Sequence, residues 1–133
     1  MSAATTQFPT ATILAYPRIG RNRELKRALE ARWAGRITEA ELIQAANDLR
    51  KENLARLVEL GLNPSDASLA DAPSLYDHVL DATILLGAIP PRFAGREGLD
   101  LYFALARGDD EVGPEEMTKW FDTNYHYLVP EIG

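Results

Sequence analysis

The first segment with residue types suited to binding is P-R-I-G-x-x-R-E-L-K, which runs from Pro17 to Lys26. Hydrophobic residues at helical spacing predict a helix over 23–33 that follows the glycine turn. Three cations share the side of this helix opposite its hydrophobic residues: Arg23, Lys26 and Arg27. Together with the N–H groups of the helix start, they could hold a carboxylate or a phosphate. The alternative is local pairing with Glu30, one turn further on.

Charge is unevenly distributed around this segment. Residues 18–36 contain seven basic and two acidic side chains, a net charge of +5 in a chain whose net charge is -6. The remainder therefore carries -11, which would repel a long polyanion. A basic patch of this kind suits a compact anion, whereas the alternative is a solvated helix face with local ion pairs.

A second segment, T-K-W-F-D-T-N-Y-H-Y from Thr118 to Tyr127, places polar groups among four aromatic residues. If it is one extended strand, Lys119 and His126 face opposite ways. Polar groups among aromatics at a strand end are typical of a ligand pocket in an α/β fold, although, taken alone, the segment favours a strand that bridges core and surface. Lys119 could hold an anion or pair with a nearby acid.

A third segment, S-L-Y-D-H-V-L-D from Ser74 to Asp81, begins as a helix with Ser74 as its N-cap. Asp77 and Asp81 lie one turn apart, while His78 points elsewhere on the helix. The spacing therefore argues against acid–base catalysis by this group.

The elements that must position these segments alternate along the chain. A β-branched run predicts a buried strand over 10–16, and a T-x-x-E capping box at Thr38 and Glu41 opens a second helix that ends near Leu60. Residues 62–73 predict a loop or a poor strand at 67–70. Further helices are expected over 75–86 and 99–107, then an acidic loop over 109–116 and a strand within 117–129. This order predicts an α/β chain with parallel strand pairing.

Composition excludes several classes of function. The chain has 133 residues and no cysteine, so a disulfide, a thiolate zinc site and a cysteine nucleophile are excluded. The acidic net charge argues against nucleic acid as a partner. No apolar run reaches 18 residues and no secretory signal is visible, so we expect no membrane contact and a cytoplasmic protein.

Taken together, three segments resemble the cobalamin-independent methionine synthases. They are PRIGRNRELKRALEARWAGRI (17–37), LYDHVLDATILLGAIPPRF (75–93) and EMTKWFDTNYHYLVPEI (116–132). The family consists of zinc enzymes that methylate homocysteine from 5-methyltetrahydropteroyltri-L-glutamate without cobalamin, and it has two face-to-face (β/α)8 barrels. The resemblance implies that residues 10–133 are the first part of the N-terminal barrel, an incomplete TIM-type barrel, because a whole one takes about 250 residues. Residues 1–9 are expected to be a flexible tail.

The resemblance also implies the binding residues. The family's R-E-L-K segment and the lysine of M-T-K-W contact the folate substrate, which corresponds here to Arg23, Glu24, Leu25, Lys26 and Lys119. A cluster of cations suits the carboxylates of a triglutamate tail. Zinc would be held by His, Glu and two Cys in the C-terminal barrel, so this chain would supply no zinc ligand and no catalytic residue. One departure is Pro73, where the family has an aromatic residue.

The implied partners are 5-methyltetrahydropteroyltri-L-glutamate and the C-terminal barrel of the same enzyme. The alternative from another class is a standalone, non-enzymatic remnant that acts as an anion-binding or protein-interaction module. A third interpretation, an independent small enzyme, lacks a nucleophile–base pair or a metal constellation in the sequence.

Overall fold

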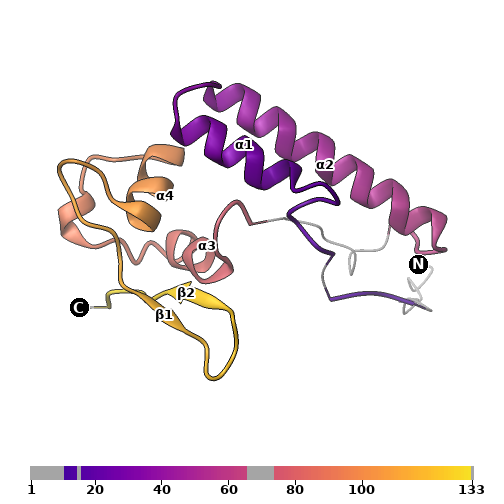
Figure 1. Ribbon diagram of the computed structural model, residues 1–133. Coiled ribbons are helices and arrows are strands. Elements are labelled where there is room, and N and C mark those ends of the chain that lie inside the picture. The colour runs from indigo at the N-terminus through magenta and orange to yellow at the C-terminus, as the bar shows by residue number, and fades with distance from the viewer. Residues whose placement is uncertain (1–10, 15, 66–73, 133) are drawn as a thin grey trace, which may run out of the picture. The chain divides into compact units, whose positions relative to one another are not determined.

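A computed structural model describes residues 11–14, 16–65 and 74–132, which fall into two compact units, one up to residue 73 and one from residue 74. The first unit contains α1 (Glu24–Trp33) and α2 (Glu39–Glu59). The second contains α3 (His78–Leu85), the 3₁₀ turn η2 (Pro91–Phe93), α4 (Gly98–Arg107), and strands β1 (Met117–Lys119) and β2 (His126–Leu128). The protein is therefore helix-rich, with one small two-stranded sheet among its described residues (Figure 1).

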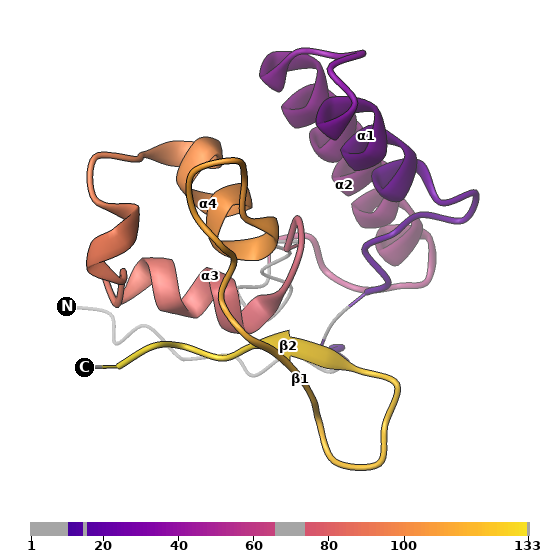
Figure 2. The same cartoon turned by 60° about the vertical axis from the view of Figure 1, so that its left-hand side comes forward.

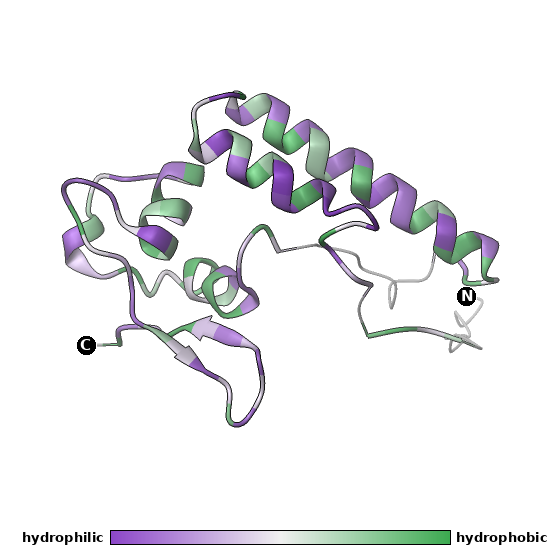
Figure 3. Cartoon of the chain, viewed as in Figure 1, coloured by the Kyte–Doolittle hydropathy of each residue, from purple (hydrophilic) through white to green (hydrophobic). Residues whose placement is uncertain are grey.

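In the first unit, α1 and α2 lie side by side as a helical hairpin (Figures 1 and 2). The predicted capping box is confirmed: Thr38 Oγ1 accepts the N–H of Glu41, and the Glu41 carboxylate accepts the N–H of Thr38. Hydrophobic and hydrophilic residues alternate around α2 (Figure 3), as expected of an amphipathic helix. Leucines from both helices form the buried seam: Leu25, Leu29, Leu42, Leu49 and Leu57. Leu60, at the C-cap of α2, lies outside this seam and is 57% exposed.

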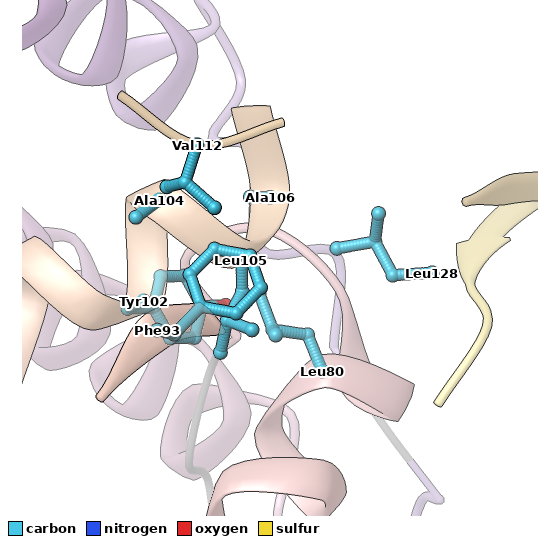
Figure 4. Packing of buried hydrophobic residues seen from close by; sticks show 8 residues of the cluster. All are labelled: Leu80, Phe93, Tyr102, Ala104, Leu105, Ala106, Val112 and Leu128. Carbon is cyan, nitrogen blue, oxygen red and sulfur yellow. The ribbon is translucent and has the colours of Figure 1, made fainter. Parts of the chain in front are cut away.

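The second unit is built around a hydrophobic core to which α3, η2, α4 and β2 contribute. Leu80 of α3, Phe93 of η2, Leu105 of α4 and Leu128 of β2 converge there, with at most 1% of each residue exposed (Figure 4). Burying four such side chains contributes roughly 1.5–3 kcal/mol each before entropy is counted. The residues of 75–86 are mostly hydrophobic, but not all of them are buried: Leu85 and Leu86 are more than 80% exposed.

The start of α3 also differs from the prediction. The N-cap is Asp77, whose side chain accepts the N–H of Leu80, whereas Ser74 is buried beside the Tyr102 hydroxyl. Tyr76 donates its backbone N–H to that hydroxyl, at 2.9 Å. The backbone before Asp77 is therefore bound to α4, and the helix begins three residues later than expected.

The predicted parallel pairing is wrong for the strands that the structure describes. β1 and β2 pair antiparallel, with Met117 opposite Leu128 and Lys119 opposite His126. The connection over 120–125 is a tight turn, and a parallel pair needs a crossover of a dozen or more residues. The strand predicted within 117–129 is confirmed as this hairpin, but it is not one extended strand.

The strand predicted over 10–16 is also not found. Residues 11–14 and 16 lie in no strand, and residues 10 and 15 lie outside the described residues. A strand needs a neighbour for its N–H and C=O groups, and the only described strands, β1 and β2, pair with each other. The incomplete barrel stays a prediction. The tail over 1–9, the poor strand at 67–70 and Pro73 lie outside the described residues.

Candidate functional site

The basic segment at the start of α1 is held in shape by its own hydrogen bonds. Arg23 donates its N–H to the carbonyl of Gly20 at 3.1 Å, and Leu25 donates to the carbonyl of Ile19 at 3.0 Å. Gly20 has a φ of +90°, and Arg23 takes the left-handed conformation with a φ of 61°. An arginine in this conformation costs about 1–2 kcal/mol, so the surrounding bonds must hold it there.

Glu24 has a structural part in this turn. Both of its carboxylate oxygens accept the backbone N–H of Asn22, at 3.2 and 3.0 Å. Hydrogen bonds from its own backbone N–H and from Asn22, helped by the charge of Arg27, hold the pKa of Glu24 below its usual value. Glu24 therefore stays ionised, and its negative charge lies next to the cations of the same segment.

The cations of this segment lie on the solvent side of α1. Arg23, Lys26 and Arg27 are exposed, whereas Leu25 is only 2% exposed and packs into the helical hairpin. Lys26 Nζ lies 3.7 Å from Glu30 Oε1, and both side chains are about half exposed. Such a pair contributes about 0.3–0.5 kcal/mol at most, so an incoming anion can readily displace it. Arg23 forms no salt bridge with any described residue.

Lys119 lies in the second unit, at the end of β1 where the hairpin turns. It is exposed, directly opposite His126, and forms no ion pair with the described residues. The prediction that Lys119 and His126 face opposite ways is therefore wrong, because opposed residues of an antiparallel pair project to the same face. Lys119 and the α1 cations belong to different units, and each group is described within its own unit.

Aromatic rings accompany Lys119 on the hairpin. The Trp120 ring packs edge-on against Phe121 at 4.9 Å and against Tyr127 at 5.8 Å, measured between centroids. Trp120 and Phe121 remain 50% and 76% exposed. The rings therefore stiffen the turn beside Lys119 without entering the core.

The group at Asp77, His78 and Asp81 is structural. Asp81 accepts a 2.8 Å hydrogen bond from the hydroxyl of Tyr102, and burial raises the pKa of Tyr102 to about 12. His78 Nδ1 lies 3.8 Å from Asp81 Oδ2, closer than the sequence predicted. Because both carboxylates are engaged in bonds that hold the unit together, the group presents no free base beside a nucleophile.

The sequence did not predict the long-range hydrogen bonds of Asp77. Its carboxylate accepts hydrogen bonds from the hydroxyl of Tyr125 and from the backbone N–H of Leu128, as well as from the first turn of α3. The local signal was an Asp ahead of a hydrophobic helical run, which indicates an N-cap. Nothing local indicates the two partners that lie about fifty residues away.

The described residues offer no site for zinc. The sequence has no cysteine, and the described residues contain no group of three His, Asp or Glu side chains that could hold a metal ion. Within the same residues, no helix combines the length and the hydropathy that crossing a membrane requires.

Comparison with known proteins identifies the family. Residues 10–133 match the family described as cobalamin-independent synthase, N-terminal domain. The chain is 55% identical to a 5-methyltetrahydropteroyltriglutamate–homocysteine methyltransferase of Streptomyces coelicolor and 56% identical to one of Rhodococcus jostii, and each match covers 92% of this chain and 16% of the relative. An enzyme of that name from Mycobacterium leprae is 52% identical over 96% of this chain and 17% of its own length.

The chain thus spans about a sixth of the length of the curated relatives it matches. The family's description agrees with the expectation that no cobalamin takes part. The match runs through the basic turn, α3 and the hairpin, the segments that carried the resemblance in the sequence. The chain belongs to the N-terminal domain family of the cobalamin-independent methionine synthases.

Proposed function

We propose that this chain is the N-terminal portion of a methyltransferase that makes methionine, and that it binds the triglutamate tail of 5-methyltetrahydropteroyltri-L-glutamate. In this proposal the methyl group passes to homocysteine in the complete enzyme, where the C-terminal barrel is the partner domain and zinc is bound outside this chain. Residues 10–133 form the first part of an N-terminal barrel, and the protein works in the cytoplasm. The chain alone carries no catalytic residue.

The observation that carries this proposal is the exposed cationic side of α1. Arg23 and Lys26 lie in the solvent with weak or no internal pairing, although their helix is firmly packed on its other side. An arginine guanidinium can hold one carboxylate with two hydrogen bonds, and a lysine ammonium acts as a point charge. Several such contacts add up along a flexible chain of carboxylates, although each contributes only about 0–1 kcal/mol.

The remaining residues of the proposed site have different parts. Lys119 supplies a further cation from the second unit, one that forms no ion pair with the residues that the structure describes. Leu25 anchors the helix through its burial, and Glu24 shapes the turn by binding Asn22. We therefore assign the contacts with the tail to the cations Arg23, Lys26 and Lys119, while Glu24 and Leu25 keep the segment in the required conformation.

The test is a comparison of ligands that differ only in their tails. Calorimetry measures the affinity of the chain for the triglutamate and the monoglutamate forms of 5-methyltetrahydrofolate. We expect tighter binding of the triglutamate, and loss of that preference in the double variant Arg23→Gln/Lys26→Gln. The matched control is Arg50→Gln/Lys51→Gln on α2, which removes the same charge elsewhere in the unit. An unchanged preference in the α1 variant contradicts the assignment of these residues.

The alternative, a non-enzymatic anion-binding module, predicts a different result in the same experiment. Such a module would bind free tri-γ-glutamate as tightly as the whole folate, because only the carboxylates would matter. Tighter binding of the folate than of the free tail, together with loss of the preference in the α1 variant, supports the methyltransferase proposal.

A further inference from the structure

A buried side chain, Asp77, joins the hairpin that carries Lys119 to α3 by hydrogen bonds, in addition to the packing of Leu128 in the core. Asp77 is 4% exposed, and each of its carboxylate oxygens reaches a different part of the hairpin. Oδ2 accepts the backbone N–H of Leu128 at 3.1 Å, and Oδ1 accepts the hydroxyl of Tyr125. The same Oδ2 accepts the N–H of Leu80 at 3.2 Å, so the first turn of α3 and the hairpin share one acceptor group.

These contacts lie on both sides of the position opposite Lys119. Lys119 pairs with His126 across the hairpin, and the two residues bound by Asp77, Tyr125 and Leu128, flank His126 in the sequence. Backbone bonds extend the pairing on either side, from Trp120 to Tyr125 and from Val129 to Glu116. A strand fixed at 125 and 128 leaves its partner at 119 little freedom to shift in register or twist.

The backbone at Asp77 is in turn held by hydrogen bonds to Tyr102 of α4. The hydroxyl of Tyr102, in α4, accepts the N–H of Tyr76 at 2.9 Å and of Asp77 at 3.4 Å, and it donates to Asp81 at 2.8 Å. The chain of bonds therefore runs from α4 through α3 to β2. Figure 2 shows α3 next to the hairpin in this unit. Hydrogen bonds to a buried carboxylate are strong because no water competes for them. Loss of Asp77 would therefore loosen the hairpin as well as remove the cap of α3.

We propose that Asp77 is a positioning residue for the contact between Lys119 and the folate tail. It does not touch the ligand; it fixes the hairpin so that the ammonium group of Lys119 is presented in one place. This inference rests on the proposed function, because it assumes that Lys119 binds the tail. A lysine on a loose hairpin would lose more conformational freedom on binding, and affinity would fall accordingly.

The variant that separates the two parts of Asp77 is Asp77→Ser. Serine is also a favoured N-cap, so its hydroxyl can still accept the N–H of Leu80 and preserve α3. Serine is shorter and lacks the second oxygen, the one that accepts the Tyr125 hydroxyl, so it cannot cap α3 and keep the whole set of contacts with the hairpin. The matched pair Tyr125→Phe and Tyr127→Phe removes one hydroxyl each, and only that of Tyr125 bonds to Asp77.

The first measurement needs no ligand. The chain has two tryptophans, so Trp33→Phe leaves Trp120, next to Lys119, as the only fluorophore of its kind. In that background we expect acrylamide to quench Trp120 more strongly after Asp77→Ser and after Tyr125→Phe, with no change after Tyr127→Phe. Circular dichroism checks that the helices persist. Unchanged quenching in Asp77→Ser overturns the proposal, whatever the ligand does.

The second measurement is a double-mutant cycle on affinity for the folate triglutamate. We expect Asp77→Ser to weaken binding several-fold in the parent chain and to have no further effect in a Lys119→Ala background. A similar loss in both backgrounds means a general structural effect and overturns the positioning role. Lys119→Ala without effect on binding refutes the part of the proposed function that this inference needs, and the inference fails with it. The quenching result then still shows whether Asp77 fastens the hairpin, so the two failures are distinguishable.

Discussion

Glu24 binds the backbone of Asn22 with both carboxylate oxygens, at 3.2 and 3.0 Å, and so closes the turn that precedes α1. The residue that begins the helix thereby fixes the loop from which Arg23 projects. The conformation of the basic segment depends on this contact and on Gly20, whose backbone lies beneath the Glu24 side chain.

Replacing Gly20 with alanine should destabilise the first unit more than the same change at Gly35. Both glycines have positive φ, so both variants carry the left-handed penalty of about 1–2 kcal/mol. A Cβ at Gly20 would also clash with Glu24 Oε2 and lie 3.2 Å from Leu49 Cδ1, whereas a Cβ at Gly35 would have no neighbour within 4 Å. Urea unfolding of Gly20→Ala and Gly35→Ala measures the difference. Equal losses of unfolding free energy would show that Glu24 moves aside at no cost.

The capping box of α2 gives a second prediction. Thr38 Oγ1 accepts the N–H of Glu41 at 3.2 Å, and alanine at this position leaves that donor without its partner. We expect Thr38→Ala to lower the free energy of unfolding by about 1 kcal/mol, the usual effect of losing an N-cap. Thr38→Ser keeps the hydroxyl and should stay close to the parent. If the serine variant loses as much stability as the alanine variant, the cap does not explain the effect.

The buried carboxyl of Glu115 predicts a pH dependence. It is 2% exposed, and burial, helped by the nearby Glu131 carboxylate, raises the pKa of Glu115 above its usual value of 4.5. Above pH 4.5 the carboxyl of Glu115 is still protonated in the folded chain but ionised in the unfolded chain. The stability that the protonated Glu115 contributes is therefore complete below pH 4.5. It is lost as the pH rises through the raised pKa of the folded state.

Replacing Glu115 with glutamine removes the titrating carboxyl and should remove its contribution to the pH dependence of the free energy of unfolding. Unfolding free energies of the parent and of Glu115→Gln, measured from pH 4 to pH 8, should differ increasingly in favour of the variant as the pH rises. Glu116→Gln, at the neighbouring exposed position, controls for the loss of one negative charge. A parent-to-variant difference that stays constant across this range contradicts the prediction.

The core of the second unit predicts a sharp contrast between two leucines. Leu105 is fully buried among the residues of Figure 4, and Leu86 is 81% exposed. Leu105→Ala should cost about 2–5 kcal/mol, because it removes buried methyl groups and leaves a cavity. Leu86→Ala should change stability by no more than about 0.5 kcal/mol. Thermal unfolding followed by circular dichroism compares the two, and a comparable loss in both variants would show that Leu86 is packed in solution.

Much of the helical structure could be predicted from the sequence because its determinants are local. The stripe of α1, the capping box of Thr38 and Glu41, and the last turn of α4 at Arg107 each depend on residues within a few positions of one another. The same local geometry placed Arg23 and Lys26 on the exposed side of α1. The segments 17–37, 75–93 and 116–132 are long and specific enough to indicate the family, and the comparison with the family model confirmed it.

Pairing and capping over long distances were decided only by the tertiary structure. Residues 117–129 have the composition of a strand, but the turn over 120–125 makes them a hairpin, and no alternation rule specifies where a chain reverses. Asp77 accepts hydrogen bonds from Tyr125 and Leu128 because folding brings α3 against β2. A carboxylate buried at that contact is stabilised by accepting hydrogen bonds from the donors around it. The sequence determined which side chains could bind an anion, and the packing of α3 against β2 decided how the hairpin that carries Lys119 is held.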